Sequence, residues 1–495
     1  MISVLLNGHD FQYEVGELLK LFVEAKEIQF IEEKALVDDQ SFLLVNNLTH
    51  QTDQISITTR LIKDDKIVSE KNFDMQLEHQ DPLEERKFIK RMIKLSIYEV
   101  LSKVYDIIPP WGILTGIRPT KIVHDLMDKG LKMDQIKQKL KDDYRISEEK
   151  IHLVTSVALV ERPFIESNHE ETVSLYIGIP FCPTKCVYCS FPSNPLNKDK
   201  NQIKDYLIAL NYEIQEIGKI LKNIGKKVET LYIGGGTPTS LDEEALEMLM
   251  KAIKNNIDLD AIKEITVEAG RPDTITKKKL SILKENAVNR ISINPQTMNP
   301  RTLKLIGRSH TPQDIIDTYQ LAKQIGFDTI NMDTIIGLPG EMAEDIQRTM
   351  EIIGELNPEN ITVHTLAIKK TSQLRGNIQN YRLAKEDEAK KMLDITQKMM
   401  KAFKLMPYYM YRQKYMVGNL ENIGYAKPGH ECLYNIQIME ERQSIIALGA
   451  GATSKIFYSA ENRLERVPNV TNVDQYIARV AEMIDRKKKE LYKCI

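Results

Sequence analysis

The stretch TVSLYIGIPFCPTKCVYCS, residues 172–190, decides how the rest of this sequence is read. Its first part, SLYIGI (174–179), is short, apolar and rich in residues that favour strands, which predicts a buried β-strand. Its second part places cysteines at positions 182, 186 and 189, a C-x3-C-x2-C array. A tight loop with this spacing can turn three thiolates toward one small cluster. The stretch therefore predicts a strand that leads directly into a metal-binding loop.

Five further segments have the same short, β-branched character as the first. They are TLYIGGG (230–236), EITVEAG (264–270), RISINPQ (290–296), TINMDTIIGL (329–338) and NITVHTLAI (360–368). Amphipathic helical patterns lie between them, for example at 201–225 and 312–326. Alternating strands and helices indicate a parallel sheet with right-handed crossovers. Six such units, where a closed barrel has eight, predict an α/β fold built on an open, partial (β/α)6 barrel.

The regions on either side of these units have different patterns. Residues 1–165 contain strand patterns at 27–32, 41–47 and 54–62 and a helical pattern at 82–105, which suggest an α+β accessory domain. After about residue 380, helical patterns at 385–403 and 472–493 enclose a segment rich in tyrosine and glycine. We therefore predict three domains: an α+β domain at 1–165, the partial barrel at 166–380, and a mainly helical, substrate-facing domain at 381–495.

Composition excludes several classes of protein. The 495 residues include 68 Lys and Arg and 70 Asp and Glu, for a net charge of −2, so a nucleic-acid partner is not expected. Five cysteines are too few for a disulfide scaffold. The N-terminus lacks a basic region followed by a long apolar stretch, and no apolar run approaches the ~18 residues needed to span a bilayer. We expect a cytoplasmic protein without a membrane span.

The chemically distinctive residues follow the ends of the predicted strands. The cysteines follow the first strand, GGGTPT (234–239) follows the second, and Glu268 and Arg271 follow the third. Gln296 ends the fourth, and GLPG (337–340) follows the fifth. In this architecture the carboxyl ends of the strands form one face, and that face carries the chemistry. These residues are therefore expected to surround one site.

The three clustered cysteines admit more than one interpretation. Three thiolates can hold a four-iron cluster that leaves one iron open to an exogenous ligand, unlike the four-cysteine electron carriers. A zinc site completed by Cys432 or a histidine is the main alternative, although zinc sites commonly use paired ligand units and no second pair exists here. A redox dithiol formed by Cys186 and Cys189 lacks a thioredoxin-like context.

Three motifs together resemble radical S-adenosylmethionine (SAM) enzymes: YIGIPFCPTKCVYC (176–189), GGGTPT (234–239) and NMDTIIGLPG (331–340). They are most similar to the oxygen-independent coproporphyrinogen III oxidase superfamily, and this likeness covers about 172–455. With WGILTGIRPTK (111–121) and YRQKYMVGNLENIGYAKPG (411–429), the whole chain looks like the HemZ-type branch of that superfamily.

The resemblance implies cofactors and a set of contacts. Cys182, Cys186 and Cys189 would hold a [4Fe-4S] cluster, and one or two molecules of SAM would bind beside it. The implied SAM contacts are Tyr176, Tyr188, Gly235, Gly236, Thr237, Glu268, Gln296, Arg308, Asp333 and Ala367. The glycines would let backbone N–H groups approach a ligand closely. Considered singly, Tyr188 could equally serve loop packing, and the charged residues could be solvated rim charges.

The resemblance also implies a reaction. The enzyme would convert propionate side chains of a porphyrinogen to vinyl groups by oxidative decarboxylation in haem biosynthesis, with a flavodoxin- or ferredoxin-type electron donor. The cofactor would supply the radical chemistry, so no catalytic side chain is assigned. Propionates need cationic partners, and the candidates are Arg412, Lys414, Lys427 and Lys455. Tyr408, Tyr409, Tyr411 and Tyr415 could cover a tetrapyrrole face or form the edge of a core.

The sequence departs from the family pattern at two places. The decarboxylating branch has a fourth cysteine directly after the trio, where this chain has Ser190. The related haem-chaperone branch has a His-Asn-x-x-Tyr-Trp motif, of which Tyr434 and Met439 replace the His and the Trp, although His430 or Cys432 could still bind iron. Two alternatives therefore remain beside the decarboxylase: a haem-binding chaperone, and an enzyme that modifies or degrades haem anaerobically.

Overall fold

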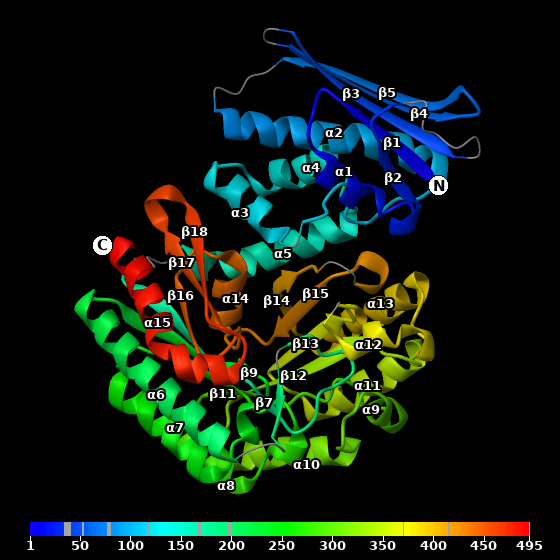
Figure 1. The fold of residues 1–495 in the computed structure, drawn as a ribbon. Helices are drawn as coiled ribbons and strands as arrows, with labels where there is room; N and C mark the ends of the chain where they lie inside the picture. Colours follow the sequence, from blue (N-terminus) through cyan, green and yellow to red (C-terminus); the bar gives the residue numbers. More distant parts are fainter. Residues whose placement is uncertain are drawn as a thin grey trace. The chain divides into compact units, whose positions relative to one another are not determined.

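The computed structural model describes residues 1–33, 41–51, 54–76, 81–116, 118–166, 170–191, 193–196, 200–369, 371–413 and 416–494. The chain divides into two compact units, Met1–Thr155 and Ser156–Ile495 (Figure 1). The division into three domains remains a prediction. Within the described ranges, no helix combines the length and the apolar character that a bilayer-spanning segment requires.

The N-terminal unit contains a five-stranded sheet of order β2-β1-β3-β4-β5. Its strands are β1 (Ile2–Asn7), β2 (Ile28–Ile31), β3 (Phe42–Gln51), β4 (Gln54–Lys63) and β5 (Lys66–Gln76). Its helices are α1 (Gln12–Leu19), α2 (Pro82–Tyr105), α3 (Thr120–Asp128) and α4 (Met133–Tyr144), and α5 (Glu148–Ile165) continues past residue 155. The three predicted strands and the predicted helix at 82–105 are present; β1, β5 and α1 were not predicted from the sequence.

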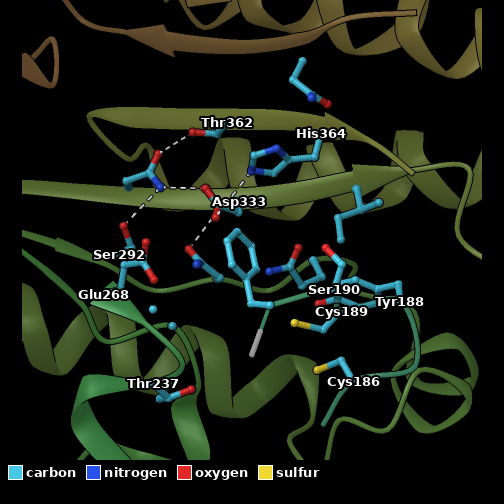
Figure 2. Close-up of a pocket in the computed structure, with 18 of the residues that line it drawn as sticks. Cys186, Tyr188, Cys189, Ser190, Thr237, Glu268, Ser292, Asp333, Thr362 and His364 are labelled. Carbon is cyan, nitrogen blue, oxygen red and sulfur yellow. Dashed lines mark hydrogen bonds and ion pairs between the residues drawn. The ribbon is translucent and has the colours of Figure 1, made fainter. Parts of the chain in front are cut away.

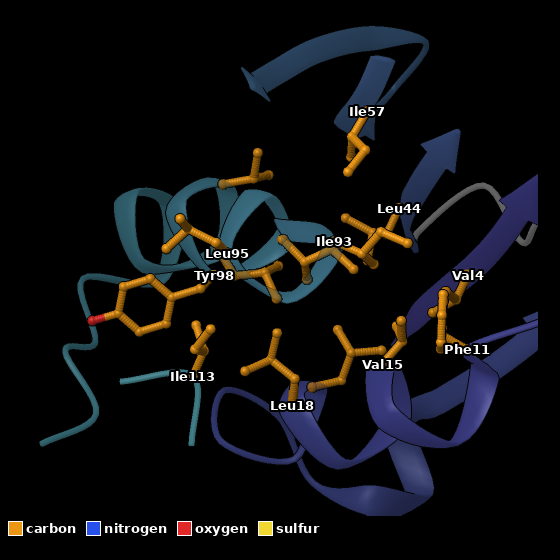
Figure 3. Packing of buried hydrophobic residues seen from close by; sticks show 14 of the residues in the cluster. Val4, Phe11, Val15, Leu18, Leu44, Ile57, Ile93, Leu95, Tyr98 and Ile113 are labelled. Atoms are coloured by element: carbon orange, nitrogen blue, oxygen red, sulfur yellow. The ribbon is translucent and has the colours of Figure 1, made fainter. Parts of the chain in front are cut away.

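Periodicity explains how this sheet and α2 form a core. Alternate residues of β4, including Ile55, Ile57 and Leu61, are buried, while Ile89 and Ile93 repeat at helical spacing along α2. These side chains meet in one apolar cluster, shown in Figure 3. Burial of each large side chain stabilises the unit by about 1.5–3 kcal/mol. The Asp81 carboxylate caps α2 by accepting a bond from the Leu83 backbone N–H at 3.0 Å.

The C-terminal unit is built on six parallel strands that stand side by side in chain order. They are β6 (Thr172–Ile179), β9 (Lys227–Gly235), β10 (Glu264–Glu268), β11 (Arg290–Ser292), β12 (Thr329–Ile336) and β13 (Asn360–Thr365). The helices α6 (Lys200–Asn223), α7 (Glu243–Asn256), α8 (Lys277–Glu285), α10 (Pro312–Ile325) and α11 (Ala343–Leu356) connect them and lie along the outer side of the curved sheet (Figure 1). The predicted partial barrel is confirmed.

Residues after 380 extend this same sheet at both ends. The helices expected at 385–403 and 472–493 are present as α13 (Glu386–Ala402) and α15 (Val473–Leu491), and α14 (Leu433–Glu440) lies between them. Five strands that the sequence did not predict accompany these helices. They are β14 (Met406–Tyr411) and β15 (Asn422–Ala426) next to β13, and β16 (Ile445–Leu448), β17 (Thr453–Tyr458) and β18 (Arg463–Pro468) next to β6. The expectation of a mainly helical segment therefore overlooked short strands that depend on the edges of the barrel for pairing.

Candidate functional site

A cavity of about 380 Å³ opens at the carboxyl ends of the six parallel strands. This volume lies in the range of small-molecule sites, which is about 300–1,000 Å³. Its walls come from the cysteine loop, from the ends of β9 to β13, and from β14. The face that the sequence singled out is therefore one continuous site.

The cysteine loop leaves β6 through the short strand β7 (Phe181–Cys182), and Cys182, Cys186 and Cys189 all line the cavity. Figure 2 shows Cys186 and Cys189 with their sulfur atoms at its floor. The loop is fastened on two sides. Arg271 Nη1 donates to Thr184 Oγ1 at 2.8 Å, and the Val187 N–H donates to the Ile306 carbonyl at 3.2 Å. The three thiols are thus held together by the surrounding fold.

The chemistry of these thiols fits a metal cluster. Burial raises the pKa of the Cys182 and Cys189 thiols, so their thiolate forms need a strong cation nearby. Cys182 Sγ lies 3.5 Å from Thr237 Oγ1. Cys432, the fourth ligand of the zinc alternative, instead donates to Glu264 Oε1 at 3.2 Å and packs among tyrosines. A three-thiolate set therefore matches a [4Fe-4S] cluster with one open iron better than a zinc site.

The GGGTPT motif packs against the cysteine loop. The Gly236 and Thr237 N–H groups donate to the carbonyls of Ile179 and Phe181, both at 2.8 Å. A Cβ on Gly236 would lie 2.4 Å from the Phe181 carbonyl oxygen, so no other residue fits there. These two N–H groups are occupied within the chain, contrary to the expectation that they face a ligand. Gly235, Gly236 and Thr237 nevertheless line the cavity.

Glu268 is a half-buried carboxylate at the end of β10 on the cavity wall. The Tyr232 hydroxyl donates to its Oε1 at 2.7 Å. Burial raises its pKa to about 7, helped by the nearby negative charge of Asp333, although the bonds from Tyr232 and from the Gly235 N–H act in the opposite direction. A cationic ligand group beside Glu268 would favour its ionised form.

A row of hydrogen-bonded polar side chains crosses the three strands β11, β12 and β13 above the cysteine loop (Figure 2). Thr362 Oγ1 donates to Asn331 Oδ1 at 3.0 Å, and Asn331 Nδ2 donates to Asp333 Oδ1 at 2.7 Å and to Ser292 Oγ at 3.3 Å. His364 Nε2 lies 3.6 Å from Asp333 Oδ2. Burial alone would raise the pKa of Asp333, but the bonds from His364 and Asn331 bring it below its usual value. Asp333 is therefore ionised, and its carboxylate lies on the cavity wall, where it can bind a ligand.

Gln296 and Arg308 also line the cavity, but their side chains differ in how they are hydrogen-bonded. Gln296 has φ of 64°, and its backbone bridges to β12, where its N–H donates to the Asp333 carbonyl at 2.9 Å. Its buried Oε1 has no partner among the described residues. Arg308 Nη1 donates to the Asn294 carbonyl at 2.9 Å, and its Nη2 donates to Tyr188 Oη at 3.4 Å. Gln296 thus has an acceptor to offer a ligand, while Arg308 braces the loops.

The structure places the other predicted cofactor contacts as follows. Ala367 lines the cavity and pairs with Met416 across an isolated bridge. Tyr188 lines the cavity and also packs on an apolar cluster, so its loop-packing role is observed and its contact with a cofactor stays a prediction. Tyr176 is not among the residues that line the cavity; it stacks on Tyr232 and Tyr434, with ring centroids 6.2 Å away in each case.

Three of the four basic residues proposed for substrate propionates, Arg412, Lys427 and Lys455, are described by the structure and do not line the cavity. Arg412 Nη2 donates to the Asn419 carbonyl at 3.0 Å, because the residue follows Tyr411, which faces the cavity, and so points to the opposite side. Lys427 binds the Asn357 carbonyl at 2.8 Å, and Lys455 pairs with Glu441 at 2.9 Å. Lys414 and Tyr415 lie outside the described residues. Tyr408, Tyr409 and Tyr411 do line the cavity.

Several cavity residues were missed by the sequence analysis: Lys185, Ser292, Asn294, Asn331, Thr362, His364 and Lys369. For some of these residues, the sequence contained a pattern that could have identified them. Asn331 stands two residues before Asp333 and Thr362 two before His364, so polar residues alternate on buried strands and must share a face. Lys185 and Lys369 carried no such signal, because a lysine in a loop is ordinarily solvated.

Comparison with known proteins agrees with this geometry. The sequence pattern of the Radical SAM superfamily matches residues 176–353. The oxygen-independent coproporphyrinogen-III oxidase-like protein HemZ of Bacillus subtilis (strain 168) is 42% identical over 409 residues, which cover 82% of this chain and 81% of that protein. The heme chaperone HemW of the same strain is 34% identical over 313 residues, 62% of this chain and 76% of that protein.

Among solved structures, coproporphyrinogen III oxidase (HemN) from Escherichia coli, described as a radical SAM enzyme, superposes with a TM-score of 0.52. The match covers 66% of this chain and 73% of that chain at 24% sequence identity. This likeness shows that the two chains share a fold.

Proposed function

The chain belongs to the oxygen-independent coproporphyrinogen-III oxidase-like family of the radical SAM superfamily, and on this premise we propose that it is an oxidoreductase that converts propionate side chains of coproporphyrinogen III to vinyl groups. The observation that carries the proposal is the convergence of three thiols, the Glu268 and Asp333 carboxylates and the Gln296 amide on one cavity.

The superfamily uses a [4Fe-4S] cluster and SAM, and in this chain Cys182, Cys186 and Cys189 would hold the cluster. Together these groups supply one-electron cleavage of a carbon–sulfur bond and, through it, hydrogen-atom abstraction from an unactivated carbon. No fourth cysteine is needed at Ser190, because an open iron requires only three protein ligands.

The chain's own residues would bind and orient SAM. Glu268 would accept a bond from its ammonium group, and the unpartnered Gln296 Oε1 would accept another donor of the same molecule. Asp333, anchored by Asn331 and His364, would bind a hydroxyl or amino group further along the cavity. The rings of Tyr408, Tyr409 and Tyr411 form an apolar wall that limits access of water to the reacting atoms.

Haem binding is the second candidate function, because relatives such as HemW of B. subtilis are named heme chaperones. The local geometry favours the decarboxylase. Tyr434, at the position of the chaperone-branch histidine, is buried with its ring centroid 4.4 Å from that of Tyr232. His430 Nδ1 lies 2.8 Å from Thr329 Oγ1, and His430 is not a lining residue of the cavity. The two alternative iron ligands, His430 and Cys432, are thus both engaged within the chain.

We further propose the cytoplasm as the location and a flavodoxin- or ferredoxin-type protein as the electron donor. An oxygen-sensitive cluster and free thiols require a reducing compartment. A single-electron donor of low potential is what reductive cleavage of a sulfonium demands.

An anaerobic turnover assay tests the proposal. Reconstituted protein is incubated with a reductant, SAM and coproporphyrinogen III, and the products are separated by chromatography. We expect protoporphyrinogen and 5'-deoxyadenosine. Deoxyadenosine without a vinyl product would contradict the substrate assignment, and a Soret band on addition of haem with no turnover would favour the chaperone. The Cys186→Ala variant is the control for background cleavage.

A further inference from the structure

Among the residues that the structure describes, five lysine and arginine side chains line the cavity, and three of them are already bound within the chain. Arg271 pairs with Asp273 at 2.9 Å, Arg290 pairs with Glu264 at 3.3 Å, and Arg308 donates to backbone carbonyls. The other two, Lys185 and Lys369, make no side-chain hydrogen bond or ion pair with any residue that the structure describes. Their ammonium groups are therefore available to a ligand.

The two lysines flank the same part of the cysteine loop. Lys185 belongs to the loop itself, and Lys369 follows β13; the positive charge of each acts on the Cys189 thiol. Two bonds tie the segment after Lys369 to the loop. Thr371 Oγ1 donates to the Ser190 carbonyl at 3.2 Å, and the Leu374 N–H donates to the Val187 carbonyl at 2.8 Å. The placement of one lysine relative to the other is thus set by the fold.

An exposed aromatic ring accompanies them. Phe191 lines the cavity, yet it is 62% exposed, whereas most large apolar side chains of this unit are buried. It comes two residues after Cys189 and lines the same cavity as the two lysines. A free ring beside two free cations is complementary to a ligand with an apolar body and an anionic edge. Lys369 is partly buried, and a partly buried cation without a counter-ion gains stability when an anion binds.

We propose that Lys185, Phe191 and Lys369 form the substrate-recognition rim of the cavity: Phe191 contacts the macrocycle of a tetrapyrrole, and the two lysines each bind one of its propionates. This inference rests on the proposed function and names the residues that recognise its substrate class. As propionate-binding candidates, the two lysines replace Arg412, Lys427 and Lys455, whose side chains bind elsewhere in the chain. The bound propionates would hold the ring edge beside the cluster, where a neighbouring side chain can react.

Equilibrium binding tests the rim without any turnover. The probe is coproporphyrin III, a stable tetracarboxylate, titrated into the cluster-loaded protein and followed by porphyrin fluorescence. Its tetramethyl ester, which has the same macrocycle and no charge, is titrated in parallel. We expect Lys369→Gln and Lys185→Gln each to weaken coproporphyrin binding about fivefold and the double variant about 20-fold, with no effect on the ester. Phe191→Ser should weaken both ligands by a similar factor.

Two further variants serve as controls. Lys369→Arg keeps the charge and should bind within about twofold of the parent protein. Lys427→Gln removes a lysine that binds the Asn357 carbonyl away from the cavity and should change nothing. The cluster absorption near ~400 nm verifies that each variant retains its metal centre. Coproporphyrin binding that is unchanged in the double variant, or lost equally in Lys427→Gln, would overturn the assignment.

The outcomes separate this inference from the proposed function. If the protein binds coproporphyrin through the two lysines but forms no vinyl product, the recognition rim stands and the decarboxylase assignment fails. If vinyl product forms and the KM for coproporphyrinogen is the same in the double variant, the function stands and the rim is refuted. A shift in the cluster's reduction potential without a change in porphyrin binding would instead assign the lysines to tuning of the cluster, and it would also refute the rim.

Discussion

Two polar clusters within the same unit, one buried in the packing of helices and one on the cavity wall, differ in how completely their atoms are bonded. The packing cluster consists of Glu213, Asn469, Tyr476 and Lys487, and joins α6 to α15. Glu213 Oε1 accepts bonds from Lys487 Nζ at 2.7 Å and Asn469 Nδ2 at 3.0 Å, and its Oε2 accepts from Tyr476 Oη at 2.6 Å and the Gly449 N–H at 2.8 Å. The Glu213 and Lys487 side chains are both fully buried.

The cavity cluster, which we define as Lys185, Glu268, Gln296 and Lys369, is incomplete. Gln296 Oε1 has no partner among the described residues, the two lysines have none, and the pKa of Glu268 is raised to about 7 mainly by burial. Buried polar groups in folded proteins are normally satisfied. A satisfied buried charge therefore indicates packing, whereas unsatisfied groups gathered on one cavity indicate a ligand site.

The largest effect is expected from loss of a proposed cluster ligand, in comparison with loss of the buried Cys432 thiol. Cys186→Ala should abolish the cluster absorption near ~400 nm and reduce turnover below detection, because two thiolates cannot hold the cluster. Cys432→Ala is the matched control: Cys432 donates to Glu264 and is not expected to bind metal, so that variant should keep its iron. Iron and sulfide analysis of both proteins checks the prediction, and full iron content in Cys186→Ala would refute the ligand assignment.

A large effect on stability is expected at the packing cluster. Lys487→Met removes the cation that faces the buried Glu213 carboxylate and should lower the free energy of unfolding by about 3–5 kcal/mol. Arg463→Gln breaks an exposed pair, in which Arg463 and Glu461 are 45% and 60% exposed, and should destabilise the protein far less, because solvent screens exposed charges. Urea denaturation followed by circular dichroism measures both. Equal costs would mean that burial does not distinguish the two pairs.

At the cavity cluster we expect the opposite: a substitution should lower ligand affinity and leave the free energy of unfolding nearly unchanged. Gln296→Met removes an oxygen that has no partner among the described residues, so the free energy of unfolding should change by less than about 0.5 kcal/mol. SAM affinity should fall about tenfold if that oxygen accepts a bond from the ligand. Equilibrium dialysis with SAM, together with urea denaturation, gives both numbers. If the variant is destabilised and its SAM affinity is unchanged, the Gln296 side chain contributes to packing and does not bind SAM.

A smaller effect is expected from pH. Because the pKa of Glu268 is raised to about 7, the carboxylate is mostly neutral at pH 6 and mostly ionised at pH 8. Only the ionised form attracts an ammonium group, so SAM affinity should rise about fivefold across this interval. Glu268→Gln should bind more weakly and lose the dependence on pH. A pH profile that is identical in both proteins would assign the titration to another group.

Much of the barrel was predictable from local patterns. β-Branched residues in six short runs, separated by amphipathic helices, have few alternatives to a parallel sheet, and the helix at 82–105 coincides with α2. Strands β14 to β18 were not predictable in the same way, because short segments such as Ile445–Leu448 are strands only through pairing with an edge that the barrel supplies. The same reason explains why β1, which pairs with β2 and β3, was overlooked.

By itself, the sequence determined the chemistry. The cysteine spacing, the glycines of GGGTPT and the acidic residues at strand ends predicted several residues that line the cavity, among them the three proposed cluster ligands, because these depend on short-range spacing and on strand direction. Which cationic side chains remain available to a ligand became clear from the three-dimensional arrangement. Lys427 and Lys185 look alike in the sequence, yet Lys427 binds the Asn357 carbonyl, and Lys185 faces the cavity without a partner among the described residues. Pairing of a charged side chain depends on groups far away in the chain, and it is this pairing that separates a structural charge from one that can bind substrate.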